Sequence, residues 1–143
     1  FNTVIRKRIM NISRFVIILI VFFISSPVTS YEWKLVYENK FNNDKVFIDI
    51  SNITKQDGLL YFWDMLNHKE FNTTHDYWSV TAYIEANCEE FWYRKLKLYM
   101  HKEKMGLSDP FFETKNRSHI IFKPKKKDSG QYILLKEACD LSD

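Results

Sequence analysis

Hydrophobic and polar residues alternate with a period of two in several short runs between residues 31 and 122, which is the pattern of half-buried β-strands. In the longest run, residues 77–88, every even-numbered position is apolar and the odd-numbered positions are mostly polar. Turn-forming residues at 42–44, 56–58 and 89–90 separate the runs. The pattern predicts strands at 33–37, 46–50, 59–66, 77–88, 91–101 and 119–122, with polar loops at 67–76 and 102–115.

A helical period is found only near the end of the chain, where Asp128 or Ser129 is suited to cap a helix. Apolar residues then recur at spacings of three and four and share one face of that helix. We therefore expect an α+β domain, with a single small antiparallel sheet of about five to six strands and one C-terminal helix packed on it. The residues on the apolar helix face are Tyr132, Leu135, Ala138 and Cys139.

The first thirty residues follow a different pattern, that of a cleavable signal peptide. Residues 15–24 are ten unbroken apolar residues, preceded by Arg14 and followed by small and polar residues. We expect cleavage before Tyr31, and Met10 is an alternative start to the chain. A membrane anchor is the competing interpretation, but a span needs about 20 apolar residues. The expected organisation is an N-terminal extension with signal peptide at 1–30 and one domain at 31–143.

The net charge depends on this cleavage. The whole sequence carries a formal charge of +3, but four of its 21 Lys and Arg residues and none of its 18 acidic residues precede Tyr31. The exported part therefore carries one net negative charge, and we expect no nucleic-acid partner. The remaining basic run at 123–127 is typical of a solvated loop.

Two cysteines, Cys88 and Cys139, are present, and an even pair in an oxidising compartment predicts one disulfide. Cys88 ends the longest predicted strand on its apolar face, and Cys139 lies on the apolar helix face. The disulfide is therefore expected to tie the helix to the sheet. Two cysteines so far apart do not make a zinc site, and no Cys-x-x-Cys pair is present for redox chemistry.

The sequence contains no recognisable catalytic pattern. It has no Gly-x-Ser-x-Gly elbow, no phosphate-binding glycine loop and no His-Glu-x-x-His motif. The four histidines, His68, His75, His101 and His119, are scattered. His68 and His75 with Asp76 could help to bind a metal, but exposed loop histidines are the simpler interpretation. We expect no enzyme activity, no cofactor and no metal.

Aromatic residues make up 17% of the sequence, and the four tryptophans all fall on predicted strands, where core filling accounts for them. The strand at 91–101 is different, because one of its faces mixes aromatic and basic side chains. Such a face suits a protein partner or an anionic ligand. The alternative is a face covered by the helix or by solvent. The candidate binding residues are Phe91, Tyr93, Lys95, Lys97 and Tyr99.

A series of spaced landmarks in this chain resembles the surface-adhesin protein E domain of Gram-negative bacteria, over nearly all of residues 33–139. The resemblance implies a sheet that carries a C-terminal helix tethered by the Cys88–Cys139 disulfide. It also implies a binding module, because the family is named for a member that attaches to host extracellular-matrix and plasma proteins. The landmarks are Trp33; Val46-Phe47-Ile48-Asp49 with Ser51, Ile53 and Gly58; Trp63; Cys88-Glu89; Arg94; Met105-Gly106; Phe122 before Pro124; and Leu134 ahead of Ala138-Cys139.

We therefore expect an exported, non-enzymatic binding module that contacts an extracellular or cell-envelope protein. The alternative is a soluble periplasmic domain with a structural, inhibitor-like or small-ligand-carrying role. No cysteine lies near residues 25–35 to receive a lipid, so a periplasmic or secreted protein is expected before display on the cell surface. No transmembrane segment is expected after signal cleavage, and the edge strands of a small open sheet suggest a homodimer.

Overall fold

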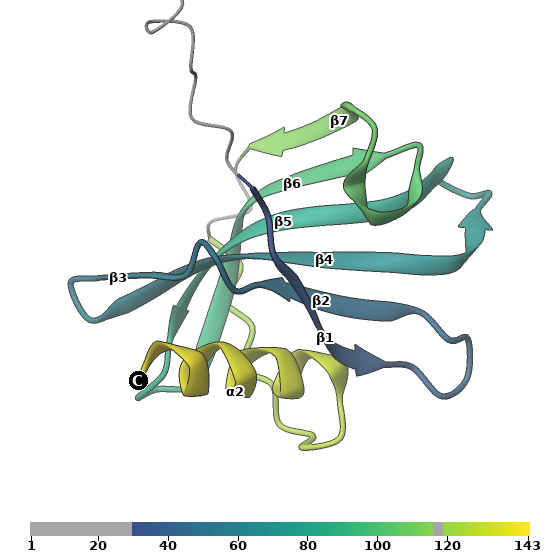
Figure 1. Cartoon of the computed structure of the whole chain (residues 1–143). Helices are drawn as coiled ribbons and strands as arrows, with labels where there is room; N and C mark the ends of the chain where they lie inside the picture. Colours follow the sequence, from purple (N-terminus) through teal and green to yellow (C-terminus); the bar gives the residue numbers. More distant parts are fainter. Residues whose placement is uncertain (1–29, 116–118) are drawn as a thin grey trace, which may run out of the picture. The chain divides into compact units, whose positions relative to one another are not determined.

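The main element of the fold is an antiparallel sheet, as the alternating pattern predicts (Figure 1). The computed structural model describes residues 30–115 and 119–143, and within them the sheet has seven strands. The strand order is β1-β2-β4-β5-β6-β7, and the short β3 pairs with one end of β4. The elements are β1 (Trp33–Glu38), β2 (Lys45–Asp49), β3 (Thr54–Gln56), β4 (Leu59–Asn72), β5 (Tyr77–Asn87), β6 (Trp92–His101), the 3-10 helix η1 (Lys104–Gly106), β7 (Pro110–Lys115) and α2 (Gly130–Ser142).

The predicted fold class is confirmed, and three segments differ from the sequence-based prediction. The polar segment 67–76 is not all loop, because β4 runs on to Asn72 and its backbone still pairs with β2 and β5. The segment 102–115 contains β7, which pairs with β6. The predicted strand at 119–122 is wrong, because only Phe122 makes an isolated bridge, to Tyr93. Whether these segments form strands depends on the pairing of their backbones, which the periodicity of the side chains indicates only indirectly.

The C-terminal helix α2 covers one face of the sheet and closes the main core. Ser129 caps it, with Oγ accepting a hydrogen bond from the N–H of Tyr132 at 3.2 Å. Leu134, Leu135 and Ala138 are buried against the sheet, opposite residues of β2, β4 and β5. The strand residues in this core include Ile48, Leu60, Phe62, Ala82, Ile84 and Ala86.

The disulfide between Cys88 and Cys139 is confirmed, with the two Cα atoms 5.8 Å apart. Cys88 follows the last residue of β5, and Cys139 lies in the last part of α2. The bond therefore fastens the helix to the end of the central strand, as the positions of the two residues in the sequence predict.

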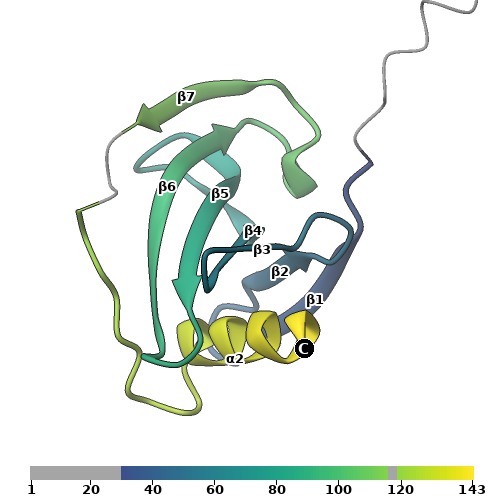
Figure 2. The same cartoon turned by 90° about the vertical axis from the view of Figure 1, so that its left-hand side faces the viewer.

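The other face of the sheet, which we call the open face, is not covered by α2. Figures 1 and 2 show α2 along one side of the curved sheet. On the open face, the segment between β6 and β7 folds back over β4 and β5 through η1. A row of aromatic side chains lies beside this segment on the open face.

A β-bulge in β6 determines which of its residues reach the open face. The pairing of β5 with β6 shifts between Tyr83 and Ile84, which leaves Leu96 as the extra residue. A one-residue shift exchanges the faces, so residues before and after Leu96 alternate in opposite phase.

The predicted signal peptide lies outside the described residues and stays a prediction. Residues 31–143 form one compact unit. Among the described helices, none has the length and apolar character needed to cross a membrane.

Candidate functional site

A groove on the open face is lined by large aromatic side chains, which we call the aromatic groove. Its volume is about 710 Å³. The rings of Tyr31 and Trp33 stack with centroids 5.4 Å apart, Tyr31 meets Trp63 edge-on at 6.4 Å, and Trp63 stacks on Tyr99 at 5.8 Å. These contacts fix the rings against one another, so the groove is formed before any ligand arrives.

The aromatic row continues beyond the groove along the open face. Tyr83 lies 5.1 Å from Trp63 and 6.2 Å from Tyr61, measured between ring centroids. The hydroxyl of Tyr61 donates to Glu85, whose other carboxylate oxygen contacts Arg94 at 2.6 Å. The hydrogen bond to Glu85 is the main cause that raises the pKa of Tyr61. A charged pair therefore borders the far end of the row.

The floor of the groove is a buried pair of polar residues, Thr81 and His101. The hydroxyl of Thr81 lies 3.0 Å from Nε2 of His101, and Nδ1 of His101 lies 2.7 Å from the carbonyl oxygen of Ser108. Because a carbonyl oxygen can only accept, Nδ1 carries a hydrogen; in the neutral ring, Nε2 then accepts from Thr81. Both ring nitrogens are thus used inside the protein.

The segment after β6 forms the second wall of the groove through Met105, Gly106 and Leu107. The N–H of Met105 donates to Oδ1 of Asn67 at 2.8 Å, and the N–H of Gly106 donates to Oγ of Ser79 at 3.0 Å. Met105 and Gly106 both have positive φ, of 58° and 65°. This wall is therefore held in a conformation that glycine adopts readily and methionine rarely does.

The five residues predicted to form a binding face do not share one face. Lys97 and Tyr99 lie on the open face, and Tyr99 lines the groove. Tyr93 and Lys95 precede the bulge and point to the helix side. Phe91 lies in the turn before β6 and packs on Tyr132 of α2, with ring centroids 4.8 Å apart. The bulge at residue 96 is the reason. It exchanges the two faces of the strand, so a strict period of two assigns the residues before it to the wrong face.

The burial of Tyr93 places it in the core and removes it from any surface. It is 4% exposed, its ring stacks on Phe122, and burial raises its pKa to about 12. Tyr99 differs, because its hydroxyl lies 3.3 Å from Glu113 and it is only partly buried. Burial first, and then the Glu113 carboxylate, raises the pKa of Tyr99, so the phenol stays neutral at physiological pH.

Three aromatic residues of the groove wall are not among the predicted binding residues. Tyr31 was not considered, and Trp33 and Trp63 were assigned to the core. The signal was present in 59–66, where both alternating faces are apolar: Leu60 and Phe62 belong to the core, whereas Tyr61 and Trp63 lie on the open face. When a strand is apolar on both faces, its second face must also pack against other residues or form a binding surface.

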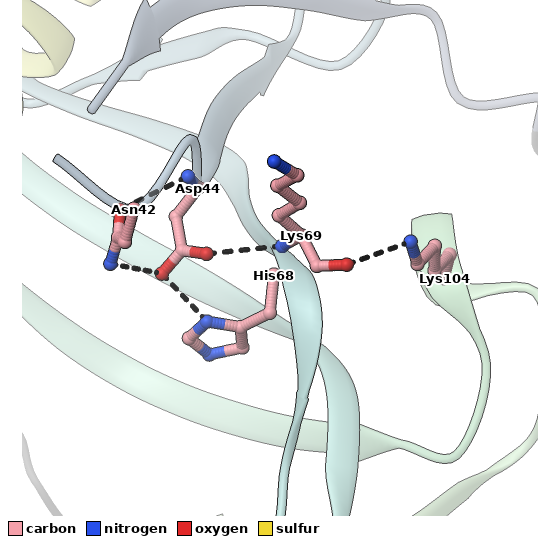
Figure 3. A network of polar contacts seen from close by, with 5 residues as sticks. All are labelled: Asn42, Asp44, His68, Lys69 and Lys104. Carbon is pink, nitrogen blue, oxygen red and sulfur yellow. Dashed lines mark hydrogen bonds and ion pairs between the residues drawn. The ribbon is translucent and has the colours of Figure 1, made fainter. Parts of the chain in front are cut away.

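A separate polar network joins the turn between β1 and β2 to the far end of β4 (Figure 3). Asp44 accepts hydrogen bonds from Nδ1 of His68 at 2.8 Å, from the N–H of Lys69 at 3.1 Å and from Asn42 at 2.9 Å. Lys104 of η1 donates to the carbonyl oxygen of Lys69 at 3.1 Å. The network braces the turn whose tip presents Phe41, 99% exposed.

An Asp–His pair of this kind also orients a catalytic base in hydrolases, which require a nucleophile on the other ring nitrogen. Nε2 of His68 is buried and has no hydrogen-bond partner within the described residues. The imidazole rings of His68 and His75 both contact the ring of Tyr77. No group of three or more His, Cys, Asp or Glu residues suited to a metal ion is found in residues 30–115 and 119–143. The geometry of this network is that of a brace.

Comparison with known proteins identifies a family. A family model described as surface-adhesin protein E matches residues 33–140, nearly the whole described domain. No curated protein and no solved structure matches the chain significantly. The matched range contains the sheet, most of α2 and both cysteines, and its start includes Trp33 of the aromatic groove.

Proposed function

Because this chain belongs to the surface-adhesin protein E family, we propose that it is an exported, non-enzymatic module that binds another protein through the aromatic groove. The observation that carries this proposal is the difference between the two faces of the sheet. Helix α2 covers one face, whereas the other holds a preformed groove walled by Tyr31, Trp33, Trp63 and Tyr99. Aromatic side chains are enriched at the centres of protein interfaces, where they contribute much of the binding energy.

The proposed location is outside the cytoplasm, in the periplasm, in the medium or on the cell surface. The family description and the signal-like pattern of residues 15–30 support it. A tagged full-length chain in a Gram-negative host separates the three locations. Digestion by protease added to intact cells indicates the surface, digestion only after the outer membrane is opened indicates the periplasm, and recovery from the medium indicates secretion. Retention of undigested protein in the cytoplasm contradicts the proposal.

Binding is tested with the exported protein and a panel of purified extracellular-matrix and plasma proteins immobilised on a sensor surface. Trp63→Ala removes a central ring of the groove, and the loss of a central interface aromatic typically weakens binding by about 30-fold or more. Trp92→Ala is the matched control, because Trp92 lies at the start of β6, outside the groove lining. We expect the control to bind within about threefold of the wild type.

Two results contradict this function. The first is that no member of the panel binds the wild-type protein, and the second is that Trp63→Ala and Trp92→Ala bind equally well. Tyr99→Ala provides a second groove variant if Trp63→Ala unfolds, and the unfolding midpoint of each variant is measured beside its affinity.

A second candidate function is the carriage of a small ligand, which the volume of the groove favours. About 710 Å³ falls within the roughly 300–1,000 Å³ of typical small-molecule sites. Native mass spectrometry of the protein as purified tests it. An added mass that Trp63→Ala abolishes supports a carrier, and the bare polypeptide mass supports the protein-binding function.

The proposed homodimer remains a prediction, and β1 and β7 are the two outer strands of the described sheet that offer an edge. Sedimentation of the exported protein at several concentrations measures it directly. A single monomeric species throughout contradicts it.

A further inference from the structure

Two of the aromatic side chains that line the groove, Trp33 and Trp63, carry an indole N–H donor. Trp92 donates its indole N–H to Glu90 at 3.1 Å, whereas the indole N–H groups of Trp33 and Trp63 meet no acceptor among the described residues. An indole N–H can donate but cannot accept. A ligand that fills the groove without leaving these groups unpaired must bring acceptors of its own.

Carboxylate and amide side chains are lacking in the described part of the lining. Among the described residues that line the groove, none is an Asp, Glu, Asn, Gln, Lys or Arg. The Thr81 and His101 side chains at the floor bond to each other, and the hydroxyl of Tyr99 bonds to Glu113. The described lining side chains therefore offer indole donors with no carboxylate or amide beside them, and the ligand that suits them is apolar and brings acceptors of its own.

This chemistry distinguishes between the ligand classes that aromatic surfaces bind. A glycan carries hydroxyl donors on most of its ring carbons, and each donor buried without an acceptor costs binding energy. An ordinary extended peptide also carries one N–H donor per residue. A proline-rich segment differs, because proline has no N–H and its carbonyl groups remain free acceptors.

The shape of the groove agrees with such a segment. Proline-rich chains adopt the polyproline II helix, which has no internal hydrogen bonds and is largely ordered before binding. Domains that bind it present aromatic rings between which proline rings pack. Here Tyr31, Trp33, Trp63 and Tyr99 form a fixed row, and the Met105–Leu107 wall faces it across a volume too large for a single side chain.

We propose that the aromatic groove binds a proline-rich segment of the partner protein in the polyproline II conformation, with the indole N–H groups of Trp33 and Trp63 donating to its carbonyl oxygens. The inference rests on the proposed function, because it names the chemistry of the partner at the same groove. The rings provide apolar contacts, and the two indole N–H groups select a ligand whose carbonyl groups are free to accept hydrogen bonds.

The test uses the full chain, exported and purified, and a decamer of proline as the probe. Binding is followed by calorimetry and by tryptophan fluorescence. Trp63→Phe and Trp33→Phe keep one aromatic ring and remove the pyrrole ring with its N–H donor, so each should weaken binding by about five- to tenfold. Trp92→Phe is the matched control and should bind the decamer within about twofold of the wild type.

The inference is overturned if the proline decamer shows no saturable binding, if Trp63→Phe, Trp33→Phe and Trp92→Phe bind it equally, or if a Gly-Ser decamer binds equally well. Saturable binding of chitohexaose in place of the proline decamer also overturns it, in favour of a glycan. Failure here is distinguishable from failure of the proposed function. If an extracellular protein binds in a Trp63-dependent manner but the proline decamer does not, only the ligand class is wrong. If the proline decamer binds but no exported location is found, only the proposed function is wrong.

Discussion

The rings of Trp63 and Tyr99 stack at 5.8 Å between centroids although their strands are not neighbours in the sheet. Strand β5 runs between β4 and β6, and at this point it places the small side chain of Thr81 opposite Tyr99. Trp63 pairs with Tyr83, two residues further along β5, so the two rings meet diagonally across that strand. Thr81 also lines the groove, beside Gly106 of η1.

Reduction of the Cys88–Cys139 disulfide should destabilise the domain without changing its fold. The bond closes a loop with a sequence separation of 51, and in the loop-entropy description such a closure contributes about 4 kcal/mol. That is a large part of the stability of a domain of this size. Urea unfolding of the oxidised and reduced proteins measures the loss.

The double variant Cys88→Ala with Cys139→Ala is the control for the effect of the reductant. It should unfold at the same urea concentration as the reduced wild type, and reductant should not change its midpoint. An unchanged midpoint for the wild type after complete reduction would show that the disulfide contributes nothing to stability.

Asp49 is a buried carboxylate that holds the start of β1, and its removal should be strongly destabilising. It is fully buried, and Oδ1 accepts from the N–H of Glu32 at 2.9 Å and from the N–H and hydroxyl of Ser51 at 3.1 and 2.7 Å. Asp49→Ala removes the acceptor that these donors share and should lower the free energy of unfolding by about 3 kcal/mol.

The same substitution should loosen the aromatic groove, because Glu32 lies between Tyr31 and Trp33 in the chain. Quenching of tryptophan fluorescence by acrylamide measures that exposure. Asp140→Ala, at an exposed helix position, is the control and should leave both the stability and the quenching nearly unchanged. Equal stability of the two variants would refute a structural role for Asp49.

Asp64 should make the stability of the domain depend on pH. It is 7% exposed on the helix side of the sheet, and burial raises its pKa above the ordinary value of 3.8, partly offset by Lys95 and by the N–H of Ala82. The native state then holds this proton more tightly than the unfolded state does. Its contribution to stability is therefore present below about pH 3.8 and is lost as the pH rises through the raised pKa.

The asparagine side chain of Asp64→Asn cannot ionise and can still accept a hydrogen bond from the N–H of Ala82. The variant therefore lacks the loss of stability that ionisation of Asp64 causes in the wild type. The variant should gain stability over the wild type as the pH rises from about 3.8 to 7. Urea unfolding at several pH values measures the difference. Asp57→Asn, at the exposed turn between β3 and β4, is the control for a carboxyl group in solvent. A difference between Asp64→Asn and wild type that is the same at every pH contradicts the argument.

The elements that were predicted correctly are those whose side-chain pattern and backbone pairing agree. Strand β5 is central, has one face in the core and alternates without interruption, so its faces could be assigned from the sequence. The cap at Ser129 and the disulfide followed from residue type and position. Strand β7 was missed because, at the edge of the sheet, Phe111 and Phe112 are both exposed and show no alternation that marks an inner face.

The groove could be predicted only in part, because it depends on features that a single strand does not reveal. The bulge at Leu96 reverses the alternation of β6, and nothing in the residues around it announces the reversal. The second wall depends on hydrogen bonds between Ser79 and residues 24 to 27 positions further along the chain. Tyr99 was predicted as a binding residue from the mixture of aromatic and basic side chains on its strand face, and it lies in the groove because it follows the bulge.

Gly130→Ala should destabilise the domain even though alanine is the better helix former. A Cβ atom at residue 130 would lie 2.8 Å from Cδ1 and 3.1 Å from Cε1 of Tyr37. In an exposed helix the same change gains roughly 0.5–1 kcal/mol. Here the ring of Tyr37 or the first turn of α2 must move, and we expect a net loss of about 1–2 kcal/mol in the free energy of unfolding.

A double-mutant cycle isolates this contact, because Tyr37→Ala removes the ring that the new methyl group would meet. In that background Gly130→Ala should become neutral or stabilising, which gives a coupling free energy of at least about 1 kcal/mol. Gln131→Ala, at the next and exposed position of α2, is the control and should change stability little in either background. If Gly130→Ala lowers stability equally with and without the Tyr37 ring, the close approach of helix and strand is not the cause, and the position of α2 on β1 must differ from the one described.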